Sequence, residues 1–410
     1  MKKYVIIGNG TAAVGCIEAI RSVDKTGEIT VVSLEKHHVY GRPLISYYLE
    51  NKTDLEHMKY RDDDFYIKNS CTVLYGKKAV ELDADKKLIT LDDDTVLPYD
   101  SLCVATGSTP FVPPFEGLDS VENKFTFISL DDALSLEKQL NKDSRVLIVG
   151  AGLIGLKCAE GIKERVKSVT VCDLADRVLS SILDNDCAKI VQKHLEENSI
   201  KFMLSDSAVK FENDRALMKS GKTVDFDILV LAVGVRANTG LVKDAGGEVN
   251  RGIIVDKMCK TSLDDVYCAG DCSEGYDSSI GSNRVLAILP NAYMQGRTAG
   301  LNVAGEKVLF DNAVPMNSIG FFGLHIMSAG SYEGEMYEEK SDKGVKRFFV
   351  KDGFLKGYIL IGQTDRAGIY TSLIREKTPL ESIDFELTKK VASNLIFSQK
   401  IRRKKFGGVV

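Results

Sequence analysis

The sequence predicts an α/β protein with two similar strand–helix–strand domains, followed by a smaller α+β domain. Three observations support this prediction. Apolar strand-length runs alternate with amphipathic helix-length runs over about the first three quarters of the 410 residues, which is typical of parallel sheets covered by helices. A glycine-rich turn between a strand and a helix occurs twice, starting at Gly8 and Gly150. After about Asp311 the pattern changes to short alternating runs, including a predicted hairpin across Asp352-Gly353.

Length and composition set the broad class. A chain of 410 residues exceeds one hydrophobic core, so several domains are expected. The net charge of -4 provides no general attraction to nucleic acid or to a membrane surface, and no apolar run is long enough to cross a bilayer. The first apolar run, Tyr4–Ile7, is too short for a signal peptide, and the nine cysteines include no CxxC pair. We therefore expect a cytoplasmic protein without nucleic-acid or membrane partners.

The first glycine-rich turn has the features of a dinucleotide site. Gly8 allows the tight turn, and Gly10 lets the backbone approach a pyrophosphate. The pyrophosphate would lie at Thr11-Ala12, where unpaired N–H groups and the helix dipole favour negative charge. Glu35, expected to close the second strand 27 residues after Gly8, is placed to accept hydrogen bonds from adenosine ribose hydroxyls. The expected strand, helix and strand are Tyr4–Ile7, Thr11–Arg21 and Ile29–Leu34.

The second turn, Gly150-Ala151-Gly152-Leu153-Ile154-Gly155, repeats this arrangement with all three glycines. Asp173 ends the following strand, and an acidic residue there favours NADH because it repels the 2′-phosphate of NADPH. Arg177 could accommodate that phosphate, so NADPH stays open. A single such motif is weak, but two copies with the right flanking elements predict two Rossmann-like (three-layer ββα) dinucleotide-binding domains. The expected elements here are Arg145–Val149, Leu153–Arg165 and Ser168–Cys172.

Three further segments carry a family resemblance: Ala105–Pro110, Ala232–Asn238 and Thr261–Asp271. Together they resemble the pyridine nucleotide–disulfide oxidoreductase superfamily across about residues 1–305. Within it, Tyr40–Leu49 and Pro290–Arg297 are similar to the branch of NADH–rubredoxin reductases, ferredoxin reductases and the flavin domain of nitrite reductase.

The resemblance implies FAD and NADH as cofactors and assigns residues to each. Asp271 would bind the FAD ribityl chain, Arg42 would lie beside the flavin or its phosphates, and Val80 would offer backbone contacts to the adenine. The helix start at Leu289–Ala292 would approach the pyrimidine edge of the flavin. The expected FAD-binding residues are Gly8, Gly10, Thr11, Ala12, Glu35, Arg42, Val80, Ala105, Thr106, Gly107, Asp271, Asn291 and Ala292. The expected NAD-binding residues are Gly150, Gly152, Ile154, Gly155, Asp173, Arg177 and Gly234. The expected domains are 1–112 with 237–310 for FAD, 113–236 for NAD(H), and 311–410 for the C-terminal α+β interface domain.

Two features of the family's sulfur chemistry are missing from the sequence. Disulfide reductases carry a cysteine pair in the stretch that corresponds to Arg42–Asn51, which contains no cysteine here, and the His-Pro pair is absent from the C-terminal domain. Electrons must then leave directly from the flavin edge. Cys268 and Cys272 flank Gly270-Asp271, and their position favours packing over redox chemistry.

Lys157 is a second departure from the family pattern. Many relatives place a glutamate there, close to flavin N5 and paired with a lysine, whereas this chain has Tyr47 or Tyr48 at the position of that lysine. We expect Lys157 to supply positive charge beside N5, which would favour a negatively charged flavin. The alternative is a solvated lysine on an exposed helix face.

The expected function is hydride transfer from NADH to FAD, followed by electron transfer to a small carrier, a rubredoxin or an iron–sulfur protein. The basic tail Lys400–Lys405 could dock an acidic carrier, although such charge runs are often only solvated. A homodimer is possible, and no metal site is expected because the five histidines show no ligand spacing. The alternatives are a cysteine-independent NADH oxidase, a flavin-binding sensor or assembly factor, and an electron-transfer subunit of a larger complex.

Overall fold

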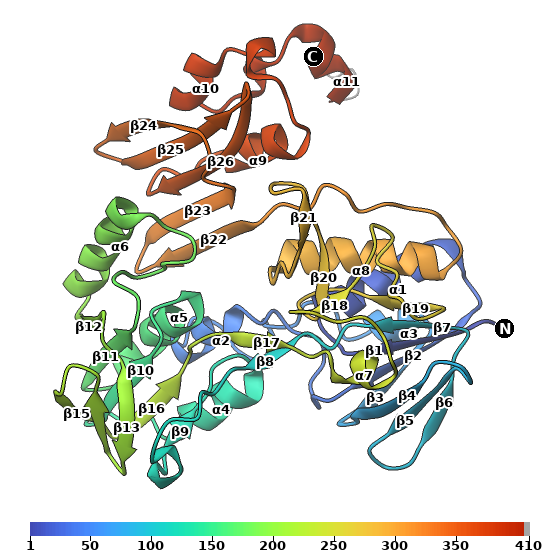
Figure 1. Cartoon of the computed structure of the whole chain (residues 1–410), viewed down its shortest axis with the longest axis horizontal. Helices are drawn as coiled ribbons and strands as arrows, with labels where there is room; N and C mark the ends of the chain where they lie inside the picture. Colours follow the sequence, from blue (N-terminus) through green and yellow to red (C-terminus); the bar gives the residue numbers. More distant parts are fainter. Residues whose placement is uncertain (406–410) are drawn as a thin grey trace.

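The computed structural model describes residues 1–405. Its first domain contains a parallel five-stranded sheet in the order β19-β7-β1-β2-β3 (Figure 1). Alternate residues of β1 face opposite layers, as the pleat of a strand requires. Tyr4 and Ile6 pack in the core under the helices, whereas Val5 and Ile7 pack against the second, antiparallel sheet β4-β5-β6. The strands are β1 (Lys3–Ile7), β2 (Glu28–Ser33), β3 (Cys71–Tyr75), β4 (Ala79–Asp83), β5 (Leu88–Leu91), β6 (Val96–Pro98), β7 (Ser101–Val104) and β19 (Val266–Cys268).

Two helices, α1 (Thr11–Val23) and α8 (Leu289–Val303), cover the other face of this sheet side by side. They approach closely because small residues lie between them. A Cβ atom on Gly296 would collide with the backbone oxygen of Ala12, and one on Gly300 would collide with that of Cys16. The resulting layers, sheet, sheet and helices, confirm the expected three-layer ββα arrangement. Further short elements here are α2 (Leu44–Leu49), α3 (Phe65–Lys68), α7 (Gly240–Asp244), β18 (Ile253–Ile254), β20 (Ser273–Asp277) and β21 (Ser282–Arg284).

The second domain repeats these layers around a parallel sheet in the order β12-β11-β10-β16-β9. Leu147 and Val149 face the small sheet β13-β14-β15, whereas Val146 and Ile148 face the helices. The strands are β9 (Lys124–Phe125), β10 (Arg145–Val149), β11 (Ser168–Asp173), β12 (Ile200–Leu204), β13 (Ala208–Glu212), β14 (Arg215–Met218), β15 (Thr223–Asp225) and β16 (Ile228–Leu231). The helices are α4 (Leu130–Glu137), α5 (Leu153–Ile162) and α6 (Asn185–Glu197).

Several element ends differ by one to three residues from the sequence-based expectation: α1 continues to Val23, β1 and β2 begin one residue early, and β11 ends one residue late. Two further differences concern α5 and Glu35. The helix expected over Leu153–Arg165 is α-helical only to Ile162 and continues as a 3-10 turn over Lys163–Arg165. Glu35 does not close its strand, because β2 ends two residues earlier at Ser33.

The first two domains are joined by a two-stranded antiparallel ribbon of β8 (Ser108–Pro110) and β17 (Val235–Ala237). The chain leaves the first domain along β8 and returns along β17. The expected domain boundaries at residues 112 and 236 lie beside this ribbon and stay a prediction.

The C-terminal part forms an antiparallel sheet in the order β22-β23-β26-β25-β24, with α9, α10 and α11 beyond it. Its β25–β26 hairpin turns at Asp352-Gly353, as expected. One face of the sheet packs on its own helices, and the other packs on the second domain through Phe321, Phe349 and Ile359. The elements are β22 (Met316–Phe321), β23 (Leu324–Gly330), β24 (Glu335–Ser341), β25 (Gly344–Lys351), β26 (Phe354–Ile361), α9 (Ala367–Arg375), α10 (Phe385–Lys390) and α11 (Gln399–Lys405).

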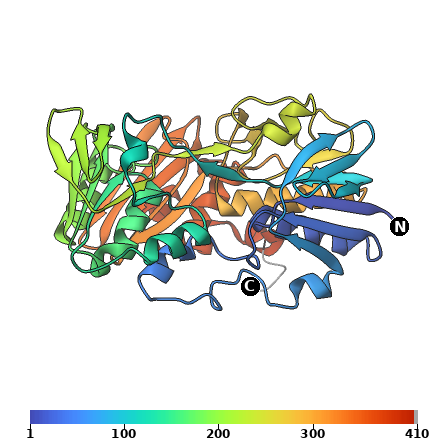
Figure 2. The same ribbon diagram turned by 90° about the horizontal axis from the view of Figure 1, so that it is seen from below.

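Viewed from below, the yellow-green strands β13–β15 and the blue strands of the first domain lie at opposite ends of the molecule (Figure 2). Within residues 1–405, no helix combines the length and the apolar character that spanning a membrane requires.

Candidate dinucleotide-binding sites

The first glycine-rich turn leads directly into α1. Gly8 has φ +113°, and a Cβ there would collide with the backbone oxygen of Ala105, so the position requires glycine. Gly10 is the N-cap of α1 and contributes no side-chain cap, and a Cβ on Gly10 would meet no atom within 4 Å. The N–H groups at Thr11-Ala12 are therefore open to a phosphate.

Residues far apart in the sequence meet beside this turn. A Cβ built on Gly270 would lie 3.1 Å from Cβ of Ala12 and 3.6 Å from Cβ of Ala292. The starts of α1 and α8 and the loop that carries Asp271 thus converge at the carboxyl ends of the parallel strands. Open α/β sheets bind their ligands at this edge.

Two asparagine side chains near this edge have buried polar atoms that a large polar cofactor could contact. Asn291 is 1% exposed, and both its Nδ2 and Oδ1 lack a hydrogen-bond partner within residues 1–405. Nδ2 of Asn9 is buried without a partner as well. Buried amide groups normally find partners, so these atoms fit contacts to a bound group such as FAD.

Asp271, on the loop at this edge, and Arg42 are charged groups that interact electrostatically with each other. Burial raises the pKa of Asp271, while Arg42 and a hydrogen bond from Ser108 act against that shift. Burial tends to lower the pKa of Arg42, but Tyr40, Glu35 and Asp271 outweigh it and the pKa is raised. The guanidinium therefore stays charged at neutral pH and can neutralise a phosphate.

Glu35 is part of a network that sequence reasoning missed. Its carboxylate pairs with Arg42 and accepts a hydrogen bond from the Tyr40 hydroxyl at 2.6 Å. That hydroxyl accepts from the N–H of Leu130 at 2.8 Å, and Arg42 donates to the Ile128 oxygen at 3.3 Å, both in the second domain. The signal was present in Tyr40-Gly41-Arg42, but only the fold shows that this segment touches two domains.

The other residues expected to bind FAD are Ala105, Thr106, Gly107 and Val80. Ala105 continues the β7 ladder, since its N–H donates to the Ile7 oxygen at 2.7 Å. Thr106 and Gly107 are held by Asn238, which donates its side-chain amide to the Thr106 oxygen at 2.8 Å and its backbone N–H to the Gly107 oxygen at 3.0 Å. Val80 lies on β4 and is 51% exposed.

The second turn has the same geometry at the start of α5. Gly150 has φ +118°, and a Cβ on it would collide with the Ala232 oxygen. Gly152, the N-cap of α5, and Gly234 have no atom within 4 Å of a built Cβ. A Cβ on Gly155 would collide with the Gly150 oxygen, so this position requires glycine. Ile154 lies in the first turn of α5. This start of α5 is thus as open to a phosphate as that of α1.

Asp173 and Arg177 lie beside this second turn. The carboxylate of Asp173 accepts the N–H of Ala151 at 2.7 Å and that of Ala175 at 2.8 Å. Arg177 forms an ion pair with Asp176 at 2.7 Å.

Lys157 is not the solvated lysine of the alternative reading, because its side chain is only 14% exposed. Its ammonium pairs with Glu160, donates to the Gly320 oxygen at 3.3 Å and lies 4.5 Å from the centroid of the Tyr47 ring. The other carboxylate oxygen of Glu160 accepts the N–H of Phe322 at 2.6 Å. Lys157 therefore lies where α2, α5 and the β22–β23 turn meet.

The cysteines Cys268 and Cys272 are both fully buried, with their sulfur atoms 3.4 Å apart and unbonded. Burial raises the pKa of Cys268, whereas the hydrogen bond with Cys268 lowers the pKa of Cys272. Both thiols are enclosed by protein, and the packing role expected for the pair stays a prediction.

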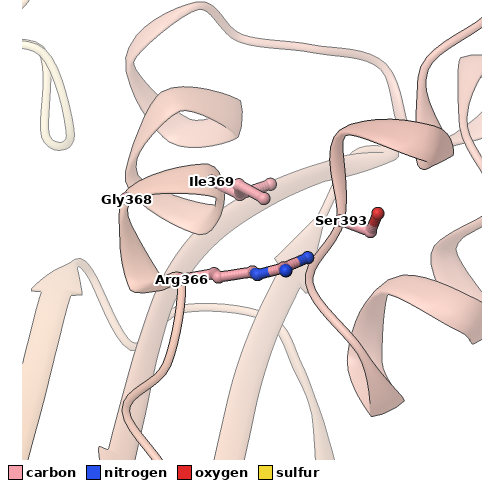
Figure 3. Close-up of a pocket in the computed structure, with 4 residues that line it drawn as sticks. All are labelled: Arg366, Gly368, Ile369 and Ser393. Carbon is pink, nitrogen blue, oxygen red and sulfur yellow. The ribbon is translucent and has the colours of Figure 1, made fainter.

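Neither a metal site nor the cavity of the C-terminal part is connected to these turns within residues 1–405. Among residues 1–405, no group of three or more His, Cys, Asp or Glu side chains could hold a metal ion. A cavity of about 600 Å³ lies in the C-terminal part, between Arg366, Gly368 and Ile369 at the start of α9 and Ser393 (Figure 3). None of the expected site residues lines it.

Two family descriptions match the chain. The family described as pyridine nucleotide-disulphide oxidoreductase matches residues 2–296, and the rubredoxin NAD+ reductase C-terminal domain matches residues 315–378.

Individual relatives agree with this match. The NADH-dependent phenylglyoxylate dehydrogenase subunit epsilon of Aromatoleum evansii is 32% identical over 394 residues, covering 92% of each chain. The assimilatory nitrate reductase electron transfer subunit of Bacillus subtilis is 29% identical and covers 92% of this chain, which spans only 50% of that protein. The covalent putidaredoxin reductase–putidaredoxin complex gives a TM-score of 0.88 over 96% of this chain and 97% of the other, at 23% identity, which shows the shared fold.

Proposed function

Because this chain belongs to the pyridine nucleotide-disulphide oxidoreductase family, whose members use FAD and NADH, we propose that it oxidises NADH and passes the electrons to a small carrier protein. The observation that carries the proposal is the pair of open helix starts. At Gly10 and at Gly152 the turn offers backbone N–H groups without a side-chain cap. One start serves each dinucleotide.

When bound, FAD accepts a hydride and can release electrons one at a time. The start of α1, Arg42 and Asp271 would bind and orient it, and the start of α5 with Asp173 would hold NADH. Lys157 would place a positive charge close to where the two rings meet, and Glu160 and Tyr47 hold that charge in position. The stretch Arg42–Asn51 contains no cysteine, so no thiol there competes for the electrons.

The acceptor we propose is a rubredoxin or a small iron–sulfur protein. The match to the rubredoxin NAD+ reductase C-terminal domain supports this class. Lys400 and Arg403 on α11 are exposed and could meet an acidic carrier, whereas the side chains of Lys404 and Lys405 lie outside the described residues. Raising the salt concentration should then slow acceptor reduction. A rate of acceptor reduction that does not depend on the salt concentration would contradict a docking role for the basic tail.

Stopped-flow reduction of the purified flavoprotein by NADH and by NADPH tests the proposal. NADH should bleach the flavin absorbance, and rubredoxin should restore it faster than dissolved oxygen does. Faster reoxidation by oxygen would identify an NADH oxidase. Slow turnover with every acceptor, together with an NADH-dependent change in oligomeric state, would identify a sensor. A colourless protein that neither binds FAD nor oxidises NADH would refute the proposal.

An electron-transfer subunit of a larger complex is the second candidate. The Aromatoleum relative, itself named as a subunit, spans 92% of this chain. Leu387, Val391 and Leu395 are 43%, 55% and 72% exposed on the C-terminal part, where apolar side chains could contact a partner. Co-purification of an iron–sulfur protein with the chain expressed from its own genome would favour this candidate.

We also propose a reducing compartment, since all nine cysteines are free thiols, and the predicted homodimer can be tested by measuring the solution mass.

A further inference from the structure

The loop after β11 is fixed against the second glycine-rich turn. Ala151, within that turn, uses both its backbone groups for this contact. Its N–H donates to Asp173 at 2.7 Å, and its oxygen accepts the N–H of Leu179 at 2.9 Å. The oxygen of Ala175 accepts the N–H of Ser205 at 2.8 Å, which holds the loop from its other side. Residues 174–179 therefore have a defined position next to the dinucleotide turn.

Arg177 lies in this loop, and its position in the sequence would allow it to bind the 2′-phosphate of NADPH. Its Nη1 pairs with Asp176 at 2.7 Å. Its Nε donates to the Leu183 oxygen at 3.3 Å, and its Nη2 donates to the Ser180 oxygen at 3.5 Å. All three guanidinium nitrogens are thus directed to protein oxygens.

Asp176 itself is open to solvent, with a side chain 62% exposed. It lies three residues after Asp173. Both carboxylate oxygens of Asp173 accept backbone N–H groups, so this carboxylate stays fixed beside the glycine-rich turn. A phosphate that approached this loop would meet two carboxylates and an arginine already paired with one of them.

We infer that Asp176 is a specificity-determining residue for the nicotinamide nucleotide: it occupies Nη1 of Arg177, which is then not available to a 2′-phosphate, and thereby favours NADH over NADPH. The inference rests on the proposed function and extends it. Asp173 disfavours the phosphate directly, while Asp176 acts through Arg177. Removing the Asp176 charge would free Nη1 of Arg177 for a phosphate, while the Leu183 and Ser180 oxygens still hold Nε and Nη2.

The test compares Asp176→Asn, Arg177→Ala and the double variant in the full-length flavoprotein. Calorimetric titration with NAD+ and NADP+ measures binding, and stopped-flow flavin reduction with NADH and NADPH measures the rate. Asp176→Asn should raise the NADPH-to-NADH ratio about two- to fivefold, since an exposed ion pair has a modest energy. The double variant should lose this gain. Asp176→Glu, which retains the charge, should leave the ratio near that of the unmodified protein.

Glu333→Gln is the matched control, because Glu333 forms an exposed ion pair with Lys351 at 3.0 Å in the C-terminal part. It should not move the ratio. An unchanged ratio in Asp176→Asn would overturn the inference, as would an equal gain in the double variant, which would mean that Asp176 acts without Arg177. If neither nucleotide binds or reduces the flavin of the unmodified protein, the proposed function itself fails, and this outcome is separate from a failure of the inference.

Discussion

The ammonium of Lys157 lies 4.5 Å from the centroid of the Tyr47 ring, in the range of a cation–π contact. The lysine is also paired with Glu160, which is itself 6% exposed at its side chain. Tyr47 belongs to the first domain, Lys157 to the second, and the Gly320 oxygen that accepts from Lys157 to the C-terminal part. One partly buried positive charge thus joins all three parts of the chain.

Lys157→Met tests whether this charge acts on the flavin. Removing it should lower the flavin reduction potential, because a nearby positive charge stabilises the more negative reduced form. We expect a decrease of about 20 mV, corresponding to about 1 kcal/mol for a partly neutralised charge. Spectroscopic redox titration measures the potential. Lys167→Met, at an exposed position of the same domain, should leave it unchanged. An unaltered potential and hydride-transfer rate in Lys157→Met would leave Lys157 with a packing role only.

Arg347→Met tests how the C-terminal sheet is attached to the second domain. The Arg347 side chain is 8% exposed and pairs with Asp184 at 2.7 Å, with Glu338 at 2.7 Å and with Asp186 at 3.3 Å. Removal of one partner from a buried ion pair is costly, although Asp186 is solvated here, so we expect a loss of about 2 kcal/mol in the free energy of unfolding. Urea denaturation measures the loss. Lys351→Met, which breaks an exposed pair, should cost less than about 1 kcal/mol. Equal losses in both variants would contradict a buried role.

The same cluster should make stability depend on pH. Burial acts to raise the pKa of Asp184, but the Cys187 N–H and Arg347 outweigh it, and the pKa falls below its ordinary value of 3.8. Lys340 and Arg347 likewise lower the pKa of Glu338 from 4.5. Both groups bind protons more weakly when folded, so their stabilisation is complete above about pH 5 and is lost as the pH falls through the lowered values. Urea midpoints between pH 6 and about pH 3 should fall less steeply in Arg347→Met than in the unmodified protein. Parallel curves would exclude this cause.

Asn291→Leu tests the buried amide at the start of α8. Within residues 1–405 both of its polar atoms lack partners, so an apolar side chain of similar size should stabilise the FAD-free protein by about 1 kcal/mol. If the amide contacts FAD, the dissociation constant of FAD should rise about tenfold at the same time. Thermal unfolding and FAD titration measure the two effects. Asn302→Leu on the same helix should only destabilise, because that amide bonds to Met258 and Val308. Unchanged FAD affinity in Asn291→Leu would remove Asn291 from the site.

The sequence by itself determined the two glycine-rich turns, the strands and helices around them, and the family. Gly8 and Gly150 could be recognised because the tight turn and the close backbone approach are local requirements that only glycine meets. The alternation of strands and helices, and the β25–β26 hairpin, likewise depend on residues close together in the chain.

Only the tertiary structure decided what the charged side chains contact. The Glu35–Arg42–Tyr40 network reaches Leu130, and Lys157 reaches Gly320 across 163 residues. The pairing of Arg177 with Asp176 is local in sequence, yet its orientation depends on Leu183 and on the fixed loop around Ala151. A side chain's partner is selected by distance in space and by burial, and neither quantity follows from the periodicity of a single segment.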